Sequence, residues 1–530
     1  MDRERRRAAG AFYTPAPLAA ALVEAALGRM SPGTGEARVV DPACGEGALL
    51  VAACERMFRG AGGRRDRAEI VRRSIFGVDV DPEAVRRARR ALAEVAGIEE
   101  DALADNVRCG DALLGEDAPA ELGRPLVWAR AFPEVFAAGG FTAVLGNPPY
   151  VDAERMARER PALRGYLARR WATATGNWDL FCVFVELALR LCAAGGVCGL
   201  IVPNKLASAS YAAGARAALT REARLVAVQD WSATTSFAAE VYPLVVVAER
   251  AAPRAEDVVV VERVRAGEDG TVAVVERREV AAASFLAASP WPLLAGEGAE
   301  LVARVRAAGR PLGEFAEVWG AATVAEAYAI AELIHEDARG LRVINSGTID
   351  RYTELWDRAP LRYLGRRVRR PTIPEALCER LPARRLAQAR TPKVIVSGMT
   401  RALEAVLDRT GEVLAGKSTT IVWWEGRDLR LLLAILNSRV ISAYYQQVFG
   451  GDRLARGFLR IGPPQLRQVP VFDPAAPANA WAGEIVAEIG ALVDEVAARG
   501  LDAERDAAIE RRVARLYGLS EAEAAALAAG

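Results

Sequence analysis

The sequence predicts an α/β protein in which a doubly wound, mostly parallel sheet is followed by an α+β domain and a helical C-terminal segment. Residues 15–250 alternate strand-like apolar runs with helical stretches, and such alternation implies a parallel sheet covered by helices on both faces. After about residue 251 this order is lost, and residues 480–529 have an almost wholly helical composition and periodicity. We therefore expect three domains, at residues 1–250, 251–475 and 476–530.

Within the first domain, polar side chains follow four of the expected strands. Strands are expected at 37–40, 74–79, 106–109, 141–145, 197–202, 225–228 and 244–248, and helices at 18–27, 48–58, 82–95 and 178–192. Asp41, Asp79, Asp111 and Asn147 stand at carboxyl ends of these strands. In open α/β sheets that edge is where ligands bind, so these four residues are the first candidates for a site.

The bulk composition indicates a globular protein of the cytoplasm. Apolar residues make up 52% of the chain and charged residues 26%, which is ordinary for such proteins. No apolar run reaches the roughly 18 residues that span a bilayer, and residues 1–10 lack the apolar core of an export signal. The seven cysteines form no CxxC pair and His335 is the single histidine, so we expect no metal site and no disulfide framework. We expect His335 to be a solvated residue at a helix end.

The segment Asp41-Pro-Ala-Cys-Gly-Glu-Gly47 follows a strand and opens a helix. Its glycines let the backbone approach a ligand, and the helix N-terminus favours an anionic group. The third glycine of the dinucleotide fingerprint is missing, which weakens an NAD interpretation. A tight turn without any ligand remains the alternative.

Two further aspartates complete the expected cofactor edge. Asp79 is placed to accept hydrogen bonds from both ribose hydroxyls of a nucleoside, whereas Asp81 is expected to cap the following helix. Asp111 is placed to accept from an adenine amino group, with a turn or cap role as the equal alternative.

Asn147-Pro148-Pro149-Tyr150 is the most specific motif. Two consecutive prolines hold the backbone extended and remove two N–H donors. The Asn147 amide oxygen and the Pro148 carbonyl together can accept both hydrogens of an exocyclic amine, which directs the nitrogen lone pair toward a methyl sulfonium without a basic side chain. Tyr150 offers a flat face for a planar base. The motif by itself also fits a Pro-Pro turn between a strand and a helix.

In this order the motifs resemble the gamma-class amino-methyltransferases. Phe12-Tyr13-Thr14-Pro15 is similar to motif X, Asp41 to Gly47 to motif I, Gly77 to Asp81 to motif II, Gly110 to Leu113 to motif III, and Asn147 to Tyr150 to motif IV. Trp178 to Phe181, Gly195 to Asn204, and Ser236-Phe237 before Tyr242 resemble motifs V, VI and VIII.

The resemblance implies a Rossmann-like methyltransferase domain that binds S-adenosyl-L-methionine and acts on DNA. The cofactor residues it implies are Tyr13, Thr14, Pro15, Asp41, Ala43, Gly45, Gly47, Asp79, Asp111 and Asn147. Asparagine at 147, rather than serine, implies adenine N6 as the target. Such enzymes flip the base out of the duplex, and Tyr150 and Phe237 are the expected aromatic partners, with Tyr242 as the competitor of Phe237. Motif X begins close to Met1, so we expect any nuclease to be a separate protein.

The C-terminal half resembles the TaqI-type specificity domain. The similar segments are 391–396, 432–438 and 466–471, and residues 361–401 contain eleven Arg or Lys against two acidic residues. Such a density suits contacts with DNA phosphates and the major groove, although a solvated face is the alternative. The expected DNA contacts are Arg366, Arg367, Arg369, Arg370, Arg384, Arg385 and Lys393.

A phosphate-binding pattern in the same half is expected to be misleading. Gly411 to Ser418 fits the Walker spacing, but that motif requires a preceding strand and a following helix. Here residues 402–407 look helical and residues 419–424 look like a strand, so we expect a hairpin and no ATPase.

The sequence therefore predicts a site-specific adenine-N6 DNA methyltransferase of a restriction–modification or phage-defence system. Two alternatives stay open. One is a methyltransferase with the same Asn-Pro-Pro-Tyr centre that acts on RNA adenine or on a protein glutamine, and the other is a non-catalytic DNA-binding subunit.

Overall fold

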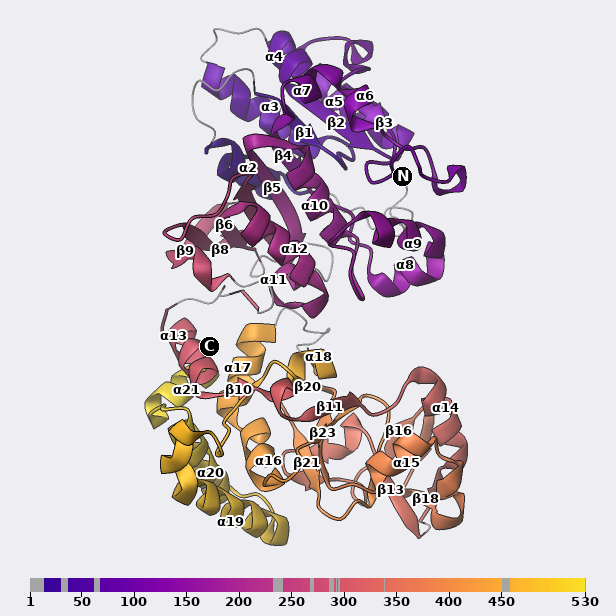
Figure 1. The fold of residues 1–530 in the computed structure, drawn as a ribbon, viewed down its shortest axis with the longest axis vertical. Coiled ribbons are helices and arrows are strands. Elements are labelled where there is room, and N and C mark those ends of the chain that lie inside the picture. Colours follow the sequence, from indigo (N-terminus) through magenta and orange to yellow (C-terminus); the bar gives the residue numbers. More distant parts are fainter. Residues whose placement is uncertain are drawn as a thin grey trace. The chain divides into compact units, whose positions relative to one another are not determined.

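The computed structural model describes residues 14–29, 37–61, 67–231, 242–266, 271–285, 290–291, 293, 296–337, 339–449 and 458–529. The chain divides into two compact units between Leu293 and Leu294 (Figure 1). Each unit has its own hydrophobic core, and each is described by itself.

The first unit is built on a nine-stranded sheet with the order β3-β2-β1-β4-β5-β7-β6-β8-β9 (Figure 1). Strands β1 to β4 and β5 are parallel neighbours, and β7 is antiparallel to both β5 and β6. The strands are β1 Val39–Asp41, β2 Ile75–Asp79, β3 Val107–Cys109, β4 Phe141–Gly146, β5 Cys192–Pro203, β6 Arg224–Asp230, β7 Pro243–Glu249, β8 Val258–Ala266 and β9 Val272–Ala281. The predicted doubly wound, mostly parallel sheet is confirmed.

Both faces of this sheet are covered, and the strand sequences show why. Side chains of successive strand residues point to opposite faces, so Val39 and Ala143 enter one hydrophobic cluster while Val40 and Val144 enter the other. Helices α2 Ala16–Leu27, α3 Ala48–Ala61, α4 Arg67–Ser74 and α5 Pro82–Ala96 contribute to the first cluster. Helices α8 Ala153–Glu159, α9 Pro161–Arg170, α10 Phe181–Leu191, α11 Lys205–Ser208 and α12 Ala213–Ala217 contribute to the second, as do α6 Trp128–Ala131 and α7 Pro133–Ala137.

The boundary expected after residue 250 lies inside this unit. The residues that follow this expected boundary form the antiparallel pair β8 and β9, and β8 pairs in parallel with β6. Val259 and Val261 of β8 are buried in the sheet's core, so β8 covers an edge that would otherwise leave the backbone groups of β6 unpaired. The hairpin's turn lies outside the described residues.

The second unit has two four-stranded sheets. One has the order β11-β23-β19-β21, formed by β11 Glu317–Gly320, β19 Lys393–Ser397, β21 Ala405–Asp408 and β23 Thr419–Trp423. The other has the order β12-β18-β13-β22, formed by β12 His335–Glu336, β13 Gly340–Ile344, β18 Pro371–Pro374 and β22 Val413–Ala415. Short pairs are β10 Arg310–Pro311 with β25 Pro470–Val471, β14 Ile349–Asp350 with β15 Thr353–Glu354, β16 Leu361–Tyr363 with β17 Arg366–Val368, and β20 Met399–Thr400 with β24 Leu459–Arg460.

The C-terminal helices share the core of this unit. Helices α16 Leu429–Asn437, α17 Arg439–Phe449, α19 Gly483–Arg499, α20 Ala503–Leu516 and α21 Glu521–Ala529 enter one cluster with β19. The remaining helices are α13 Gly296–Ala308, α14 Val324–Leu333, α15 Ala383–Ala389 and α18 Pro463–Leu466. The predicted helical C-terminal segment is present, but residues from 476 onward pack into the unit and do not form a separate body.

The segment with the phosphate-binding pattern is followed by a strand. Of residues 402–407, expected to be helical, 405–407 belong to β21 instead, because the side chains of Ala405 and Val406 are buried in the sheet. After the pattern comes β23, which pairs with β11 and β19, while β22 pairs with β13. The expected hairpin is therefore not formed, and the helix that a phosphate-binding loop requires does not follow.

His335 is exposed just after α14.

No helix within the described ranges is long and apolar enough to cross a membrane. Likewise, the described side chains include no group of three or more His, Cys, Asp or Glu that could hold a metal ion.

Lys393, expected to contact DNA, is instead a core residue. Its side chain is 1% exposed, and its Nζ forms an ion pair with the equally buried Asp408 and donates to the carbonyl of Ala389 at 3.0 Å. Asp408 also accepts from the backbone N–H groups of Gly411 and Val413. Two charges enclosed in this way are stable only as a pair, so Lys393 is withdrawn as a DNA contact.

We expect Lys393→Met to lower the free energy of unfolding of this unit by about 3–5 kcal/mol, because it leaves the Asp408 carboxylate buried without its cation. Urea unfolding measures the effect. The double variant Lys393→Met/Asp408→Asn should lose less than the sum of the two single variants; additive losses would contradict the pairing.

Candidate cofactor and catalytic site

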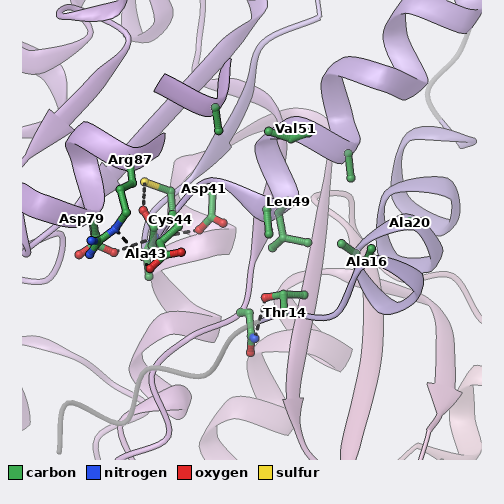
Figure 2. Close-up of a pocket in the computed structure, with 18 of the residues that line it drawn as sticks. Thr14, Ala16, Ala20, Asp41, Ala43, Cys44, Leu49, Val51, Asp79 and Arg87 are labelled. Atoms are coloured by element: carbon green, nitrogen blue, oxygen red, sulfur yellow. Dashed lines mark hydrogen bonds and ion pairs between the residues drawn. The ribbon is translucent and has the colours of Figure 1, made fainter. Parts of the chain in front are cut away.

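A cavity of about 390 Å³ opens at the carboxyl edge of the sheet in the first unit. Figure 2 shows acidic side chains on one side of it and the small apolar side chains of α2 and α3 on the other. The apolar wall includes Ala16, Ala20, Leu49 and Val51, and the polar wall includes Asp41, Glu46, Asp79 and Asp81. Thr14, Ala43, Gly45, Arg87 and Asn147 complete the part of the lining that concerns the chemistry.

The turn after β1 is fixed by carboxylates. Asp41 Oδ1 accepts from the backbone N–H of Ala43 at 2.9 Å, and Asp79 Oδ2 accepts from the N–H of Gly45 at 2.9 Å. Gly45 has φ +52° and open space where a side chain would stand, so its backbone faces the cavity directly. Each carboxylate oxygen keeps further acceptor capacity, and Asp79 is therefore able to receive ligand hydroxyls.

The cavity wall is rich in buried acids. Burial raises the pKa of Asp41 to about 8, with a further contribution from the charge of Asp79, while the N–H of Ala43 opposes the shift. Burial also raises the pKa of Asp79. Because ionised carboxylates are disfavoured here without a counter-charge, a cationic ligand fits this wall better than an anionic one.

Asn147 lies at the end of β4 and is held by the segment that precedes α2. Its Nδ2 donates to Thr14 Oγ1 at 3.0 Å, and Thr14 is buried. Its Oδ1 is buried and accepts no hydrogen bond from any described residue. A buried, unpaired acceptor costs free energy unless a ligand uses it, so the side chain is oriented with its oxygen available to an N–H donor.

The rest of the Asn-Pro-Pro-Tyr motif continues from this point. The hydrogen bonds among the described residues include none from a backbone N–H to the Pro148 carbonyl. The Tyr150 hydroxyl donates to the carbonyl of Ile201 in β5 at 3.3 Å, and burial raises its pKa. Tyr150 thus stays a neutral, anchored ring and not a base. Phe237 and Tyr13 lie outside the described residues, and Tyr242 is partly exposed.

Asp179 secures the chain that follows the motif, which the sequence did not predict. Its Oδ1 accepts from the N–H of Ala153 at 3.0 Å and its Oδ2 from the hydroxyl of Tyr211 at 2.5 Å. The adjacent N–H of Leu180 donates to the carbonyl of Val151 at 2.9 Å. The two segments, 151–153 and 179–180, are therefore held together. The sequence placed Asp179 in the stretch that resembles motif V but assigned its side chain no role.

Three expected cofactor residues do not line the cavity. Asp111 accepts from the N–H of Leu113 at 2.9 Å, which is the turn role weighed as its alternative. Gly47, with φ +88°, lies so close to α5 that a Cβ there would come within 3.2 Å of Ala88. Pro15 precedes α2 as its N-cap residue.

The apolar wall from α2 and α3 was not predicted, because small apolar residues on a helix also fit a core face.

Of the six arginines expected to contact DNA, five are exposed and one is buried. Arg366, Arg367, Arg369, Arg370 and Arg384 are exposed. Arg385 is 5% exposed, and its guanidinium bonds both carboxylate oxygens of Glu326 and the carbonyl of Gly320. Arg385 therefore ties α15 to α14, and it is withdrawn as a DNA contact together with Lys393.

Comparisons with known proteins point to methyltransferases. Residues 73–237 match the family described as Eco57I restriction-modification methylase, and residues 5–108 match the family described as RMKL-like, methyltransferase domain. The chain is 26% identical over 242 residues to the type II methyltransferase M.BanIII of Aneurinibacillus aneurinilyticus, covering 45% of this chain and 38% of that protein. It is 34% identical over 121 residues to the type II methyltransferase M.XhoI of Xanthomonas vasicola, covering 22% of this chain and 21% of that protein.

Two solved structures share the fold along most of the chain. The type IIL restriction-modification enzyme MmeI in complex with DNA gives a TM-score of 0.52 at 13% identity, covering all of this chain and 79% of that one. A nuclease-deletion mutant of the type ISP enzyme LlaGI with a DNA substrate mimic gives a TM-score of 0.51 at 11% identity, covering 91% of this chain and 54% of that one. These two likenesses show a shared fold, whereas the family matches and the type II methyltransferases support a methyltransferase of the restriction–modification type. The chain spans less than two-fifths of the length of the two type II methyltransferases that it matches.

We expect the free energy of unfolding of the first unit to fall as pH rises from about 4 to 8. The folded state holds a proton on Asp41 up to about pH 8, whereas the unfolded chain loses it near its ordinary pKa, so the native state binds more protons throughout that window. Asp41→Asn should flatten this slope, and urea unfolding at pH 5 and pH 8 checks it. An equal slope in the variant would contradict the assignment.

We expect Asp179→Ala to lower the free energy of unfolding by about 1–3 kcal/mol and to speed hydrogen exchange at the Ala153 amide, because that donor loses its acceptor. Tyr211→Phe, which keeps the ring, serves as the matched control and should leave the Ala153 amide protected. Unchanged exchange in Asp179→Ala would show that this carboxylate does not hold the segment.

Proposed function

We propose that this protein is a site-specific DNA methyltransferase that transfers a methyl group from S-adenosyl-L-methionine to the N6 amino group of adenine in double-stranded DNA. Its setting in this proposal is a restriction–modification or phage-defence system, with any endonuclease as a separate partner. The observation that carries the proposal is the buried and unpaired Oδ1 of Asn147, fixed by Thr14 at the rim of an acidic cavity.

The cavity's residues fit the cofactor. Asp79 would receive ribose hydroxyls, and the open backbone at Gly45 would lie against the ligand. The raised pKa values of Asp41 and Asp79 report acids that lack a cation. A bound sulfonium cofactor supplies both a positive charge and an electrophilic methyl group.

The chain's own contribution to the reaction is orientation of the amine. Asn147 Oδ1 accepts one hydrogen of the amino group and the Pro148 carbonyl the other, so the nitrogen lone pair turns toward the methyl carbon. The bound cofactor would supply the methyl group and keep the electron pair of the C–S bond. The amino nitrogen would then become positive, and these two acceptors would bind its hydrogens more strongly. The surplus proton then leaves to water. Tyr150 would stack against the flipped base.

DNA as the substrate is supported by the second unit and by the comparisons. The exposed arginines on β17 and α15 provide cations for phosphates. MmeI and LlaGI, which share the fold, were solved with DNA or a DNA mimic. Adenine as the base is inferred from asparagine at position 147 and from the neutral acceptor pair.

We expect Asn147→Ala to abolish most methylation of duplex DNA, with a loss of turnover on the order of a hundredfold to a thousandfold, as for other groups that act on transition-state charge. Transfer of labelled methyl groups to duplex DNA, RNA and a release factor measures it. Methylated RNA or release factor with inert DNA would overturn the proposal.

Thr14→Val is the matched companion variant. It removes the acceptor of Asn147 Nδ2 but keeps the shape and the Asn147 oxygen, so turnover should fall less than in Asn147→Ala. Single-molecule sequencing of DNA from an expressing strain identifies the modified base. If both the wild type and Asn147→Ala bind the cofactor but leave DNA unmethylated, the protein is instead a non-catalytic DNA-binding subunit.

A further inference from the structure

Four loop segments of the second unit meet at one surface. Ser346 Oγ donates to the carbonyl of Ser418, and the N–H of Gly398 donates to the same carbonyl at 2.9 Å. The N–H of Ile461 donates to the carbonyl of Gly398 at 3.0 Å. We call the surface formed by residues 345–347, 398–400, 416–418 and 459–461 the loop platform.

The β16–β17 hairpin joins the loop platform at its side. Asn345 Nδ2 donates to the carbonyl of Arg362 at 2.8 Å. The ring of Tyr363 lies directly against Gly416, where an added Cβ would come within 3.0 Å of Cε2. The hairpin and the platform are therefore one continuous surface, and the arginines of β16 and β17 extend it.

Four cations without an ion pair to a described residue gather on this surface. Arg362, Arg367, Lys417 and Arg460 are exposed, and none forms an ion pair with another described residue. Arg362 and Arg367 stand directly opposite each other in the hairpin, and like charges in that arrangement cost stability. By contrast, Arg351, Arg430 and Arg439 of the same unit are each bound to carboxylates. Exposed cations that have no counter-charge and repel one another within the fold suit a polyanionic partner.

The platform also holds a strained residue at its centre. Ser418 is exposed and has φ +68°, a conformation that is uncommon for any residue other than glycine and costs free energy. The Ser418 hydroxyl donates to the carbonyl of Lys417 and accepts from Ser346 Oγ at 3.4 Å, which leaves it acceptor capacity for a further donor. Lys417 is exposed, and Met399 on the neighbouring segment is 49% exposed. A cation, a hydroxyl and an apolar side chain are among the groups that read base edges in the major groove.

We propose that the loop platform is where this chain contacts its double-stranded DNA. Arg362, Arg367, Lys417 and Arg460 meet phosphates, and Ser418 and Met399 face base edges. The inference rests on the proposed function and names its DNA-reading surface. It also gives the Gly411 to Ser418 pattern a role: the exposed lysine and serine at its end meet the phosphates and bases of a duplex.

The phosphate contacts are tested by measuring binding to a duplex of about thirty base pairs with arbitrary sequence. Fluorescence anisotropy reports this binding at KCl concentrations between 50 and 200 mM. Each lost phosphate contact reduces the slope of log K against log salt by about 1. We therefore expect Lys417→Ala/Arg460→Ala to bind at least tenfold more weakly at low salt, with a slope smaller by about 2. Arg511→Ala, an exposed arginine of α20 without an ion pair to any described residue, is the matched control and should bind as the wild type does.

The outcomes separate the two proposals. A double variant that binds duplex DNA with the wild-type slope, in a protein that still methylates DNA, overturns the loop platform and leaves the methyltransferase intact. A wild-type protein that neither methylates nor binds duplex DNA overturns the proposed function itself. Urea unfolding of the variants, expected to be unchanged because both side chains are exposed, shows that lost binding is not lost folding.

Ser418→Gly tests base reading without disturbing the fold, because glycine adopts φ +68° readily. Loss of the hydroxyl should relax the methylated sequence at one position, with discrimination there falling on the order of tenfold, as measured by single-molecule sequencing of modified DNA. A methylated sequence identical to that of the wild type would show that Ser418 reads no base.

Discussion

The parallel pairing of β1 with β2 and β4 is the constraint on which the site depends. In register, Val40 lies between Phe76 and Val144, so all three strands end at the same edge. Asp41, Asp79 and Asn147 come from segments far apart in sequence, and this shared edge brings them to one cavity. The backbone N–H groups of Ala43 and Gly45, in the turn that follows β1, then donate to the two aspartates. The position of the site at this edge therefore depends on the sheet's topology as well as on the residues themselves.

The part of the site that could be predicted from the sequence is the part encoded locally. A strand followed by Asp, or by Asn-Pro-Pro-Tyr, is visible in a few residues, and the structure places Thr14, Asp41, Asp79 and Asn147 around one cavity as this pattern indicates. The hydrogen bond from Asn147 to Thr14 joins residues 133 positions apart, and only the fold reveals it. The same holds for Asp179 with Tyr211, whose pairing depends on how α10 packs.

The second unit was harder to predict because charge density does not show which cations are exposed. Arg366 and Lys393 belong to the same basic stretch, yet Arg366 is on the surface and Lys393 is 1% exposed beside Asp408. The distinction follows from the place of each strand: Lys393 opens β19, an interior strand that is paired on both sides and buried along its length. Arg366 lies on the short two-stranded β16–β17 hairpin. The boundary near residue 250 was wrong for a related reason, since β8 and β9 carry many charged residues although most of the valines of β8 are buried in the core of the first unit.

The buried acids of the cavity have a further consequence for the molecule as a whole. Burial keeps a proton on Asp41 up to about pH 8 and raises the pKa of Asp79 beside it, so at neutral pH the ligand-free domain holds at least one of these acids uncharged. Under the proposed function a cationic cofactor would favour the ionised acids, so its binding would be coupled to the release of a proton. Anything that binds only the folded state also raises stability. The spent cofactor, whose sulfur is neutral, would lack this coupling, so the two acids would distinguish the fresh cofactor from the spent one by charge.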